Sequence, residues 1–192
     1  MIQIKQLTKS YGDTRVLNIP VMDIPKGQVF GLVGNNGAGK TTLFSLLLDL
    51  IQATEGKVTI NRVDVSTSED WKTNTAAFLD DSFLIGYLTP EEYFYFIGEL
   101  RKVSKEEVDE LIAGYTDFFN DEILNKKKYI RDLSKGNQKK VGVVATFIGA
   151  PELLILDEPF ANLDPTTQIR LKELLTEKGK DTTTTILISS HD

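Results

Sequence analysis

Residues 29–44 read VFGLVGNNGAGKTTLF, and this stretch decides the fold. It opens with Val29–Val33, a short apolar run that has the composition of a buried strand. The next residues, Gly34–Thr41, match the pattern G-x-x-x-x-G-K-[ST] in full. From Lys40 to Ile51 the pattern predicts an apolar helix. The motif therefore lies where a phosphate-binding loop has to lie, between a strand and a helix.

The chemistry of phosphate binding explains the residue types of this loop. Glycines let the backbone curl so that successive N–H groups point inward and form a cage for phosphate oxygens. Lys40 adds a cation for the β- and γ-phosphates, and the Thr41 hydroxyl can ligate Mg²⁺. The alternative is a glycine-rich turn that caps an ordinary helix, but the Lys40 charge would then be unfavourable at a helix N-terminus. We therefore predict that a nucleotide is bound by Asn35, Asn36, Gly37, Ala38, Gly39, Lys40, Thr41 and Thr42.

A second chemical motif follows the apolar run Leu153–Leu156, which predicts a buried strand. The run ends in two adjacent acids, Asp157 and Glu158, at the edge where open α/β sheets bind ligands. Neighbouring residues of a strand point to opposite sides, so we expect different roles for them. Asp157 can hold a water molecule of the Mg²⁺ shell, and Glu158 can face the attacking water as a general base or orienting group. The alternative, a solvated strand end, becomes weaker beside a phosphate loop.

Length and composition fit one globular domain. The chain has 192 residues, of which 41% are hydrophobic and 26% are charged, a balance that argues against disorder. The formal net charge of -6 gives no reason to expect nucleic acid or anionic lipid as a partner. The sequence has no cysteine, which excludes disulfides and fits a reducing cytoplasm. The most apolar runs, Leu46–Ile51 and Val141–Ala150, are too short to cross a bilayer.

Strand and helix patterns alternate along the chain, which predicts an α/β fold with a mostly parallel sheet. Residues 82–150 contain no convincing long strand, so we interpret them as a helical subdomain inserted into a catalytic core of about residues 1–81 and 151–192. Strands are expected at Ile2–Leu7, at Val16–Ile24 with a break at Pro20, and at Gly56–Asn61, Ala76–Leu79 and Thr183–Ser189. Helices are expected to start at Thr89-Pro90 and at Ser104, and to cover Ser134–Ala150 and Pro165–Glu177.

Further motifs fall in an order that resembles the ABC (ATP-binding cassette) ATPase family over nearly the whole chain. Leu133–Gln138, which reads LSKGNQ, resembles the family signature LSGGQ. Ala161–Asp164 resembles the D-loop that follows the carboxylates, and Ser189–Asp192 resembles the switch-histidine segment. Tyr11 matches the aromatic residue that stacks on adenine, and Val16 is expected to contact the same nucleotide.

This resemblance implies a P-loop NTPase fold and an ATPase that uses ATP and Mg²⁺. Ser134 and Gly136 would complete the ATP site of a second ABC ATPase domain, so that two ATP molecules lie between two domains. The resemblance also implies a transport motor on the cytoplasmic, inner face of the cell membrane, attached through transmembrane permease subunits. A plain N-cap for Ser134 and a structural role for His191 remain the alternatives. The residues implied as catalytic are Glu158, His191 and Lys40, and those implied at the metal are Thr41, Asp157 and Asp80.

Two residues depart from the family pattern. Lys135 replaces a usual glycine of the signature, at a position that faces outward in a helix cap. Asp80 occupies the place of the Q-loop glutamine, which touches Mg²⁺ and relays to the transmembrane partner. We expect Asp80 to alter metal geometry or coupling without loss of binding. The family continues past the switch histidine with further strands and a helix, so we expect the natural chain to extend beyond Asp192.

Two other functions share some of these motifs. A soluble ABC ATPase that acts on the ribosome or another complex would carry the same set, but ribosomal versions join two such domains by a basic linker. A P-loop kinase would share the phosphate loop, whereas the signature and the switch histidine count against it. A transmembrane partner is expected to dock on residues 82–136, although each aromatic residue of Tyr93–Phe96 is more typical of a core.

Overall fold

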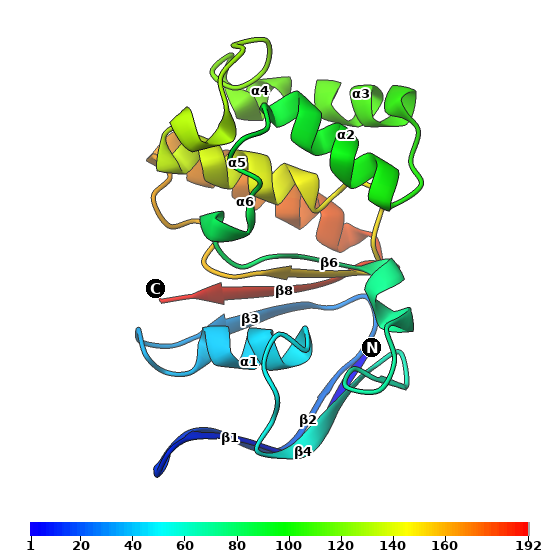
Figure 1. The fold of residues 1–192 in the computed structure, drawn as a ribbon, viewed down its shortest axis with the longest axis vertical. Coiled ribbons are helices and arrows are strands. Elements are labelled where there is room, and N and C mark those ends of the chain that lie inside the picture. The colour runs from blue at the N-terminus through cyan, green and yellow to red at the C-terminus, as the bar shows by residue number, and fades with distance from the viewer. Residues whose placement is uncertain (192) are drawn as a thin grey trace.

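Two four-stranded sheets organise the computed structural model, which describes residues 1–191. One sheet is parallel with the strand order β3-β8-β7-β6, and the other is antiparallel with the order β2-β1-β4-β5. In Figure 1 the parallel sheet crosses the middle of the molecule, and the antiparallel sheet lies at the lower end. The strands are β1 (Ile2–Tyr11), β2 (Thr14–Ile24), β3 (Val29–Val33), β4 (Glu55–Ile60), β5 (Val63–Asp64), β6 (Thr75–Phe78), β7 (Leu153–Leu156) and β8 (Thr185–Ser190).

Helices cover both faces of the parallel sheet. Helix α1 lies between the two sheets, and α5 and α6 pack on the opposite face of the parallel sheet (Figure 1). No helix within residues 1–191 is long and apolar enough to span a membrane. The helices are α1 (Lys40–Leu47), α2 (Pro90–Leu100), α3 (Lys105–Ala113), α4 (Thr116–Phe119), α5 (Lys135–Ala145) and α6 (Pro165–Lys180), with 3₁₀ turns η1 (Asp70–Asn74), η2 (Asp81–Phe83) and η3 (Ile130–Asp132).

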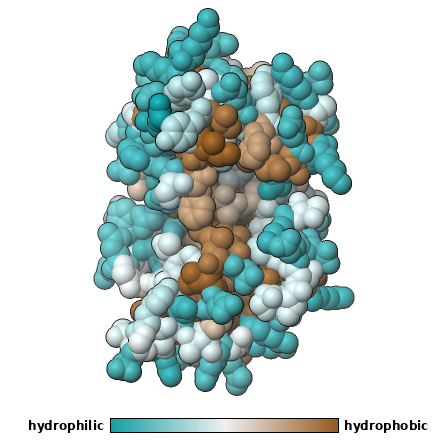
Figure 2. Space-filling model, in the orientation of Figure 1, coloured by the Kyte–Doolittle hydropathy of each residue, from teal (hydrophilic) through white to brown (hydrophobic). Residues whose placement is uncertain are grey.

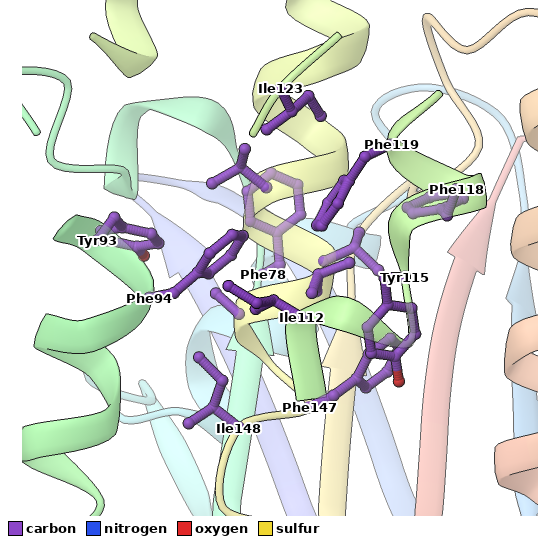
Figure 3. Close-up of a cluster of buried hydrophobic side chains, with 14 of the residues drawn as sticks. Phe78, Tyr93, Phe94, Ile112, Tyr115, Phe118, Phe119, Ile123, Phe147 and Ile148 are labelled. Carbon is purple, nitrogen blue, oxygen red and sulfur yellow. The ribbon is translucent and has the colours of Figure 1, made fainter. Parts of the chain in front are cut away.

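The parallel sheet is buried on both faces. Leu154 and Leu156 of β7 belong to the hydrophobic cluster above the sheet, whereas Leu153 and Ile155 belong to the cluster below it. Because alternate residues of a strand point to opposite faces, one continuous apolar run contributes to two cores. Figure 3 shows that aromatic rings make up much of the upper cluster, where α2, α4 and β6 meet.

The sequence signals for two helix starts are confirmed. The Thr89 hydroxyl accepts a hydrogen bond from the Glu92 N–H at 3.3 Å, and the Glu92 carboxylate accepts one from the Thr89 N–H at 2.8 Å. Ser104 and Glu107 form the same reciprocal capping box before α3. Each box provides acceptors for N–H groups that a helix end would otherwise leave unpaired.

The predicted α/β fold with a parallel sheet is confirmed, but the first strands form a separate antiparallel sheet. A short turn joins β1 to β2, and only antiparallel neighbours can be joined this way, since a parallel pair needs a long crossover. The predicted break at Pro20 was wrong. Strand β2 continues through Pro20 because it lies at the edge of its sheet, where a missing N–H costs no ladder hydrogen bond.

Two helices are shorter than their apolar patterns predict. Helix α1 ends at Leu47 and α5 ends at Ala145. Backbone positions in the left-handed region follow both ends, at Asp49 with a φ of 52° and at Gly149 with a φ of 78°. A residue in this conformation cannot continue a right-handed helix, so after Asp49 the apolar Leu50 and Ile51 lie in a bend. After α5 the apolar Phe147 and Ile148 lie in a turn that ends at Gly149.

The aromatic run near the start of α2 divides between core and surface. Tyr93 and Phe94 are buried, and Tyr95 packs partly against the upper cluster. Phe96 is 38% exposed. The expectation that these residues are individually more typical of a core is confirmed for the first two.

A glycine of α5 determines how closely this helix approaches β6. A Cβ atom added at Gly142 would lie 2.1 Å from Cε2 of the buried Phe78 ring. We expect Gly142→Ala to lower the free energy of unfolding by about 1–3 kcal/mol, the usual cost of overpacking a core. Urea unfolding followed by circular dichroism measures this change. The control is Gly31→Ala, because nothing lies within 4 Å of a Cβ atom at Gly31, and equal effects of the two substitutions would contradict the packing argument.

Candidate nucleotide-binding site

The phosphate loop joins β3 to α1 at the C-terminal edge of the parallel sheet. The Gly34 N–H donates to the Ser190 carbonyl at 3.2 Å, which fixes the start of the loop to the end of β8. Gly37 and Gly39 have φ values of 84° and 89°, in the left-handed region that favours glycine. A Cβ atom at Gly39 would also lie 2.9 Å from the carbonyl oxygen of Val16. Gly39 is therefore required on two grounds, and Val16 lies directly against the loop.

The start of α1 has the features of an anion site. Gly39 is its N-cap and offers no side chain to its first N–H groups, and the first turn contains no acidic residue. These N–H groups and the helix dipole leave positive potential at the loop. The Lys40 side chain adds a full charge there, is only 7% exposed, and donates to the carbonyls of Gly34 at 2.5 Å and Asn35 at 3.3 Å. Amide donors and a cation on one loop fit the oxygens of a nucleotide phosphate.

The Asp157 carboxylate connects three elements of the site. It accepts a hydrogen bond from the Thr41 hydroxyl of α1 at 2.5 Å and another from the Ser189 hydroxyl of β8. The Ser189 hydroxyl in turn accepts the Glu158 N–H at 2.8 Å. Asp157 is only 5% exposed, and a buried carboxylate is tolerated where hydrogen bonds replace its lost hydration.

Ser189 is a site residue that the motifs did not single out individually. The signal is in the strand register, because Leu156 pairs with Ile188 in the parallel sheet, so the following residues, Asp157 and Ser189, are neighbours. That register depends on the sheet order and not on a local pattern. Sequence motifs alone therefore cannot give the contact between these side chains.

Thr41 and Asp157 offer oxygen ligands that fit Mg²⁺. Hydroxyl and carboxylate oxygens are donors that Mg²⁺ prefers, and the ion commonly takes one or two protein carboxylates and completes its shell with phosphates and water. Within residues 1–191, no group of three or more His, Cys, Asp or Glu residues is arranged to hold a metal. The Thr41 hydroxyl and the Asp157 carboxylate are the two oxygen groups that this part of the site offers to such an ion.

Asp80, the third residue expected at the metal, has a local role in the structure. It is the N-cap of η2, and its carboxylate accepts the Ser82 N–H at 2.8 Å. The hydrogen bond from the Ser82 main chain has the larger effect and one from the Ser82 side chain the smaller, and together they hold the pKa of Asp80 below its ordinary value. Its contact with Mg²⁺ stays a prediction.

The Glu158 carboxylate brings together the three residues predicted to be catalytic. Its Oε1 lies 3.3 Å from the Lys40 Nζ, and its Oε2 lies 2.6 Å from the His191 Nδ1. Burial opposes ionisation of Glu158, but hydrogen bonds from His191 and Lys40 and their charges outweigh it, so the pKa of Glu158 lies below its ordinary value. An ionised carboxylate only accepts hydrogen bonds, so Nδ1 of His191 carries the proton in this contact. Asp192, the end of the predicted switch segment, lies outside the described residues.

The residue predicted to stack on adenine lies at the end of β1. Tyr11 pairs with Thr14 across the β1–β2 turn, two residues before Val16, which lies against the loop. Tyr11 is 54% exposed, and the Lys9 Nζ lies 4.9 Å from its ring centroid. An exposed aromatic face near the phosphate loop is suited to stacking, and this role stays a prediction.

The signature segment forms the start of α5. The Ser134 hydroxyl caps the helix by accepting the Asn137 N–H at 3.2 Å, and the first turn contains no acidic residue. Gly136 lies against the D-loop, because a Cβ atom there would be 3.0 Å from the Asn162 carbonyl oxygen. The Lys135 side chain is 69% exposed, so it faces outward as expected, and its Nζ lies 3.4 Å from Asp81. The cap geometry is compatible both with a plain N-cap and with a second anion site.

The fold and this site together define a P-loop NTPase domain. The family model described as ABC transporter matches residues 17–161, well over half of the chain. The chain therefore belongs to the ABC transporter family.

Relatives and solved structures agree with this family. The chain is 36% identical over 201 residues to YhaQ, an uncharacterized ABC transporter ATP-binding protein of Bacillus subtilis (strain 168), which covers 100% of this chain and 63% of that protein. It is 33% identical over 198 residues to the bacitracin transport ATP-binding protein BcrA of Enterococcus faecalis, covering 100% of this chain and 61% of that protein. A solved ATP binding subunit of an ABC transporter has a TM-score of 0.87 and 28% identity, covering 99% of this chain and 79% of that one. The chain thus spans less than two thirds of the length of the two curated relatives.

The bridging hydroxyl of Ser189 gives a prediction about stability. Ser189→Ala removes one donor to the buried Asp157 carboxylate and the acceptor of the Glu158 N–H. We expect the free energy of unfolding to fall by about 1–3 kcal/mol, the cost of leaving such groups unpaired, as measured by urea unfolding. Thr67→Ala removes an exposed hydroxyl and serves as the control. If both variants unfold at the urea concentration of the unsubstituted protein, the bridge does not stabilise the site.

Proposed function

We propose that this chain binds ATP with Mg²⁺ and hydrolyses it as the motor subunit of an ABC transporter. The observation that carries the proposal is the position of the Glu158 carboxylate, between Lys40 of the phosphate loop and His191 after β8. An acid held at the end of a phosphate loop, beside the Thr41 and Asp157 oxygens, suits water attack on a bound γ-phosphate.

The contacts suggest how nucleotide binding prepares the acid. The Lys40 Nζ lies 3.3 Å from Glu158, and a γ-phosphate with a larger negative charge would draw this cation toward itself. Glu158 Oε1 would then be available to accept a hydrogen bond from water, while His191 still holds Oε2. When bound, Mg²⁺ would offset the charge of the phosphates. Water attacks the γ-phosphorus, the bond to the β-phosphate oxygen breaks, and Glu158 orients the water and receives its proton.

The start of α5 supports a head-to-tail pair of such domains. In each chain the phosphate loop already supplies its own anion site, so the N–H groups and hydroxyl at Ser134 and Gly136 are available to the nucleotide of a second domain. ATP between two domains would hold them together and let them separate after hydrolysis. The partner domain can be a second copy or a different chain of the same family.

A groove on the surface is the proposed docking place for a transmembrane permease subunit. Its volume is about 280 Å³, and exposed Leu50 and Phe83 line it together with Leu48 and Leu79. Figure 2 shows a band of apolar surface down the middle of the viewed face, flanked by hydrophilic side chains. Phe83 is the one lining residue of the groove that belongs to the segment 82–136, in which docking was expected. Such docking would place the chain on the inner face of the membrane, and the bacitracin transport protein BcrA favours transport over a soluble ABC ATPase.

Removing the charge of the acid tests the hydrolytic role. Glu158→Gln keeps the shape of the side chain but cannot accept a proton, so we expect ATP hydrolysis to slow by about 10²–10⁴-fold, the usual weight of a general base. ATP binding should remain, since Lys40 and the loop amides are unchanged. Phosphate release measures the first quantity, and fluorescence titration with a labelled ATP analogue measures the second.

The same variant tests the pairing of domains. With hydrolysis slowed, ATP should accumulate between two domains, and size-exclusion chromatography in Mg-ATP should show a dimer. A Glu158→Gln protein that stays monomeric at saturating ATP and high protein concentration would contradict pairing of identical chains. Rapid hydrolysis by this variant would contradict the role of Glu158.

A further inference from the structure

Lys139 is a buried lysine that no motif explains. It lies on α5, in the second turn after Ser134, and only 8% of its surface is exposed. Lysine is almost never fully buried unless its charge is paired or hydrogen-bonded. Its Nζ donates to the main-chain carbonyl of Glu158 at 2.8 Å. The ammonium group therefore lies against the backbone of the residue that we propose as the catalytic acid.

The backbone of Glu158 needs such support. Glu158 has a φ of 46°, in the left-handed region that residues with a Cβ atom rarely adopt. Strained positions of this kind persist where the surroundings fix them. The Glu158 N–H is held by the Ser189 hydroxyl, and its carbonyl accepts both the Lys139 Nζ and the Ala161 N–H, the latter at 3.2 Å. Two side chains from two elements thus fix the turn that aims the carboxylate.

Acidic groups surround the Lys139 ammonium. Burial lowers the pKa of Lys139, and the charges of Asp81, Glu158, Asp80 and Asp157 oppose this shift, with Asp81 first. Asp81 Oδ1 is buried and has no hydrogen-bond partner within the described residues, whereas Oδ2 lies 3.4 Å from the Lys135 Nζ. The cation thus lies between the end of β6 and the end of β7.

A second contact joins the start of α5 to the segment that contains Glu158. Gly136, in the first turn of α5, approaches the Asn162 carbonyl so closely that an added Cβ atom would lie 3.0 Å from it. The first two turns of α5 therefore touch the segment 158–162 at both of its ends. A displacement at the start of α5 would be transmitted to this segment through packed groups.

We propose that Lys139 is a positioning residue that fixes the Glu158 backbone turn and links it to the start of α5. The linkage rests on the proposed function, in which the start of α5 meets the ATP of a partner domain. Closure of the pair onto Ser134 would then also set the orientation of Glu158 in the same chain.

Steady-state ATP hydrolysis by the full chain tests this proposal. Lys139→Met removes the donor and keeps a long apolar stem, and we expect kcat to fall by about 10–100-fold with an ATP KM within about twofold, because misplacing a reacting group slows chemistry and not binding. Lys139→Arg keeps the charge and the N–H donors and should recover most of the rate. Lys140→Met is the matched control, since Lys140 is also buried on the same helix but its Nζ lies over the Phe118 ring at 5.9 Å.

A double variant separates positioning from a general structural role. If Lys139 acts through Glu158, adding Lys139→Met to Glu158→Gln should slow hydrolysis no further, because the two changes affect one unit. Additive losses, or a Lys139→Met kcat equal to that of the unsubstituted protein, would overturn the proposal. Lys139→Leu, which also removes the donor, replaces the methionine variant if circular dichroism shows that the latter is unfolded. An unsubstituted protein without ATPase activity would instead refute the proposed function, so the two failures are distinguishable.

Discussion

The buried carboxylate of Asp157 is the constraint on which the rest of the site depends. A charge at 5% exposure needs donors, and the donors here are the hydroxyl of Thr41 at the start of α1 and the hydroxyl of Ser189 at the end of β8. These hydrogen bonds hold the phosphate loop, the Glu158 turn and the last described strand in one arrangement. The residues joined by these hydrogen bonds also have proposed chemical roles. Thr41 is a proposed Mg²⁺ ligand, and Ser189 holds the backbone N–H of the proposed catalytic acid, Glu158. Structural and chemical requirements therefore coincide at this edge of the sheet.

Lys40 and Glu158 form a second arrangement that depends on the first. Lys40 reaches the carbonyls of its own loop and the acid, so its charge is shared among groups that a triphosphate would displace. Glu158 has His191 as a second partner, which would keep its carboxylate oriented if Lys40 turned toward a bound phosphate. The lowered pKa of Glu158 means that the acid is ionised at neutral pH and can accept a hydrogen bond from water. Nucleotide binding and activation of the acid would thus be linked through one lysine.

Local sequence patterns predicted the strand ends and helix starts that depend only on residues close together in the sequence. Strands β3 and β7 have the predicted ends, because each is a continuous apolar run that stops at a glycine or an acid. The starts of α2 and α3 were also predictable, because their capping residues bond to N–H groups only three positions away in the sequence. The antiparallel pairing of β1 with β2 and the continuation of β2 through Pro20 depend on sheet order, which no local pattern contains. The bridge at Ser189 and the approach of Lys139 to Glu158 join residues 31 and 19 positions apart, so they could not be predicted from motifs.

The most direct test of the account is the binding of Mg-ATP to the intact chain by isothermal titration calorimetry. We predict a heat of binding that saturates at one nucleotide per chain, and its loss in Lys40→Ala, because this substitution removes the cation of the phosphate loop. Absence of binding heat in the unsubstituted protein would contradict the account, and so would an unchanged affinity in Lys40→Ala.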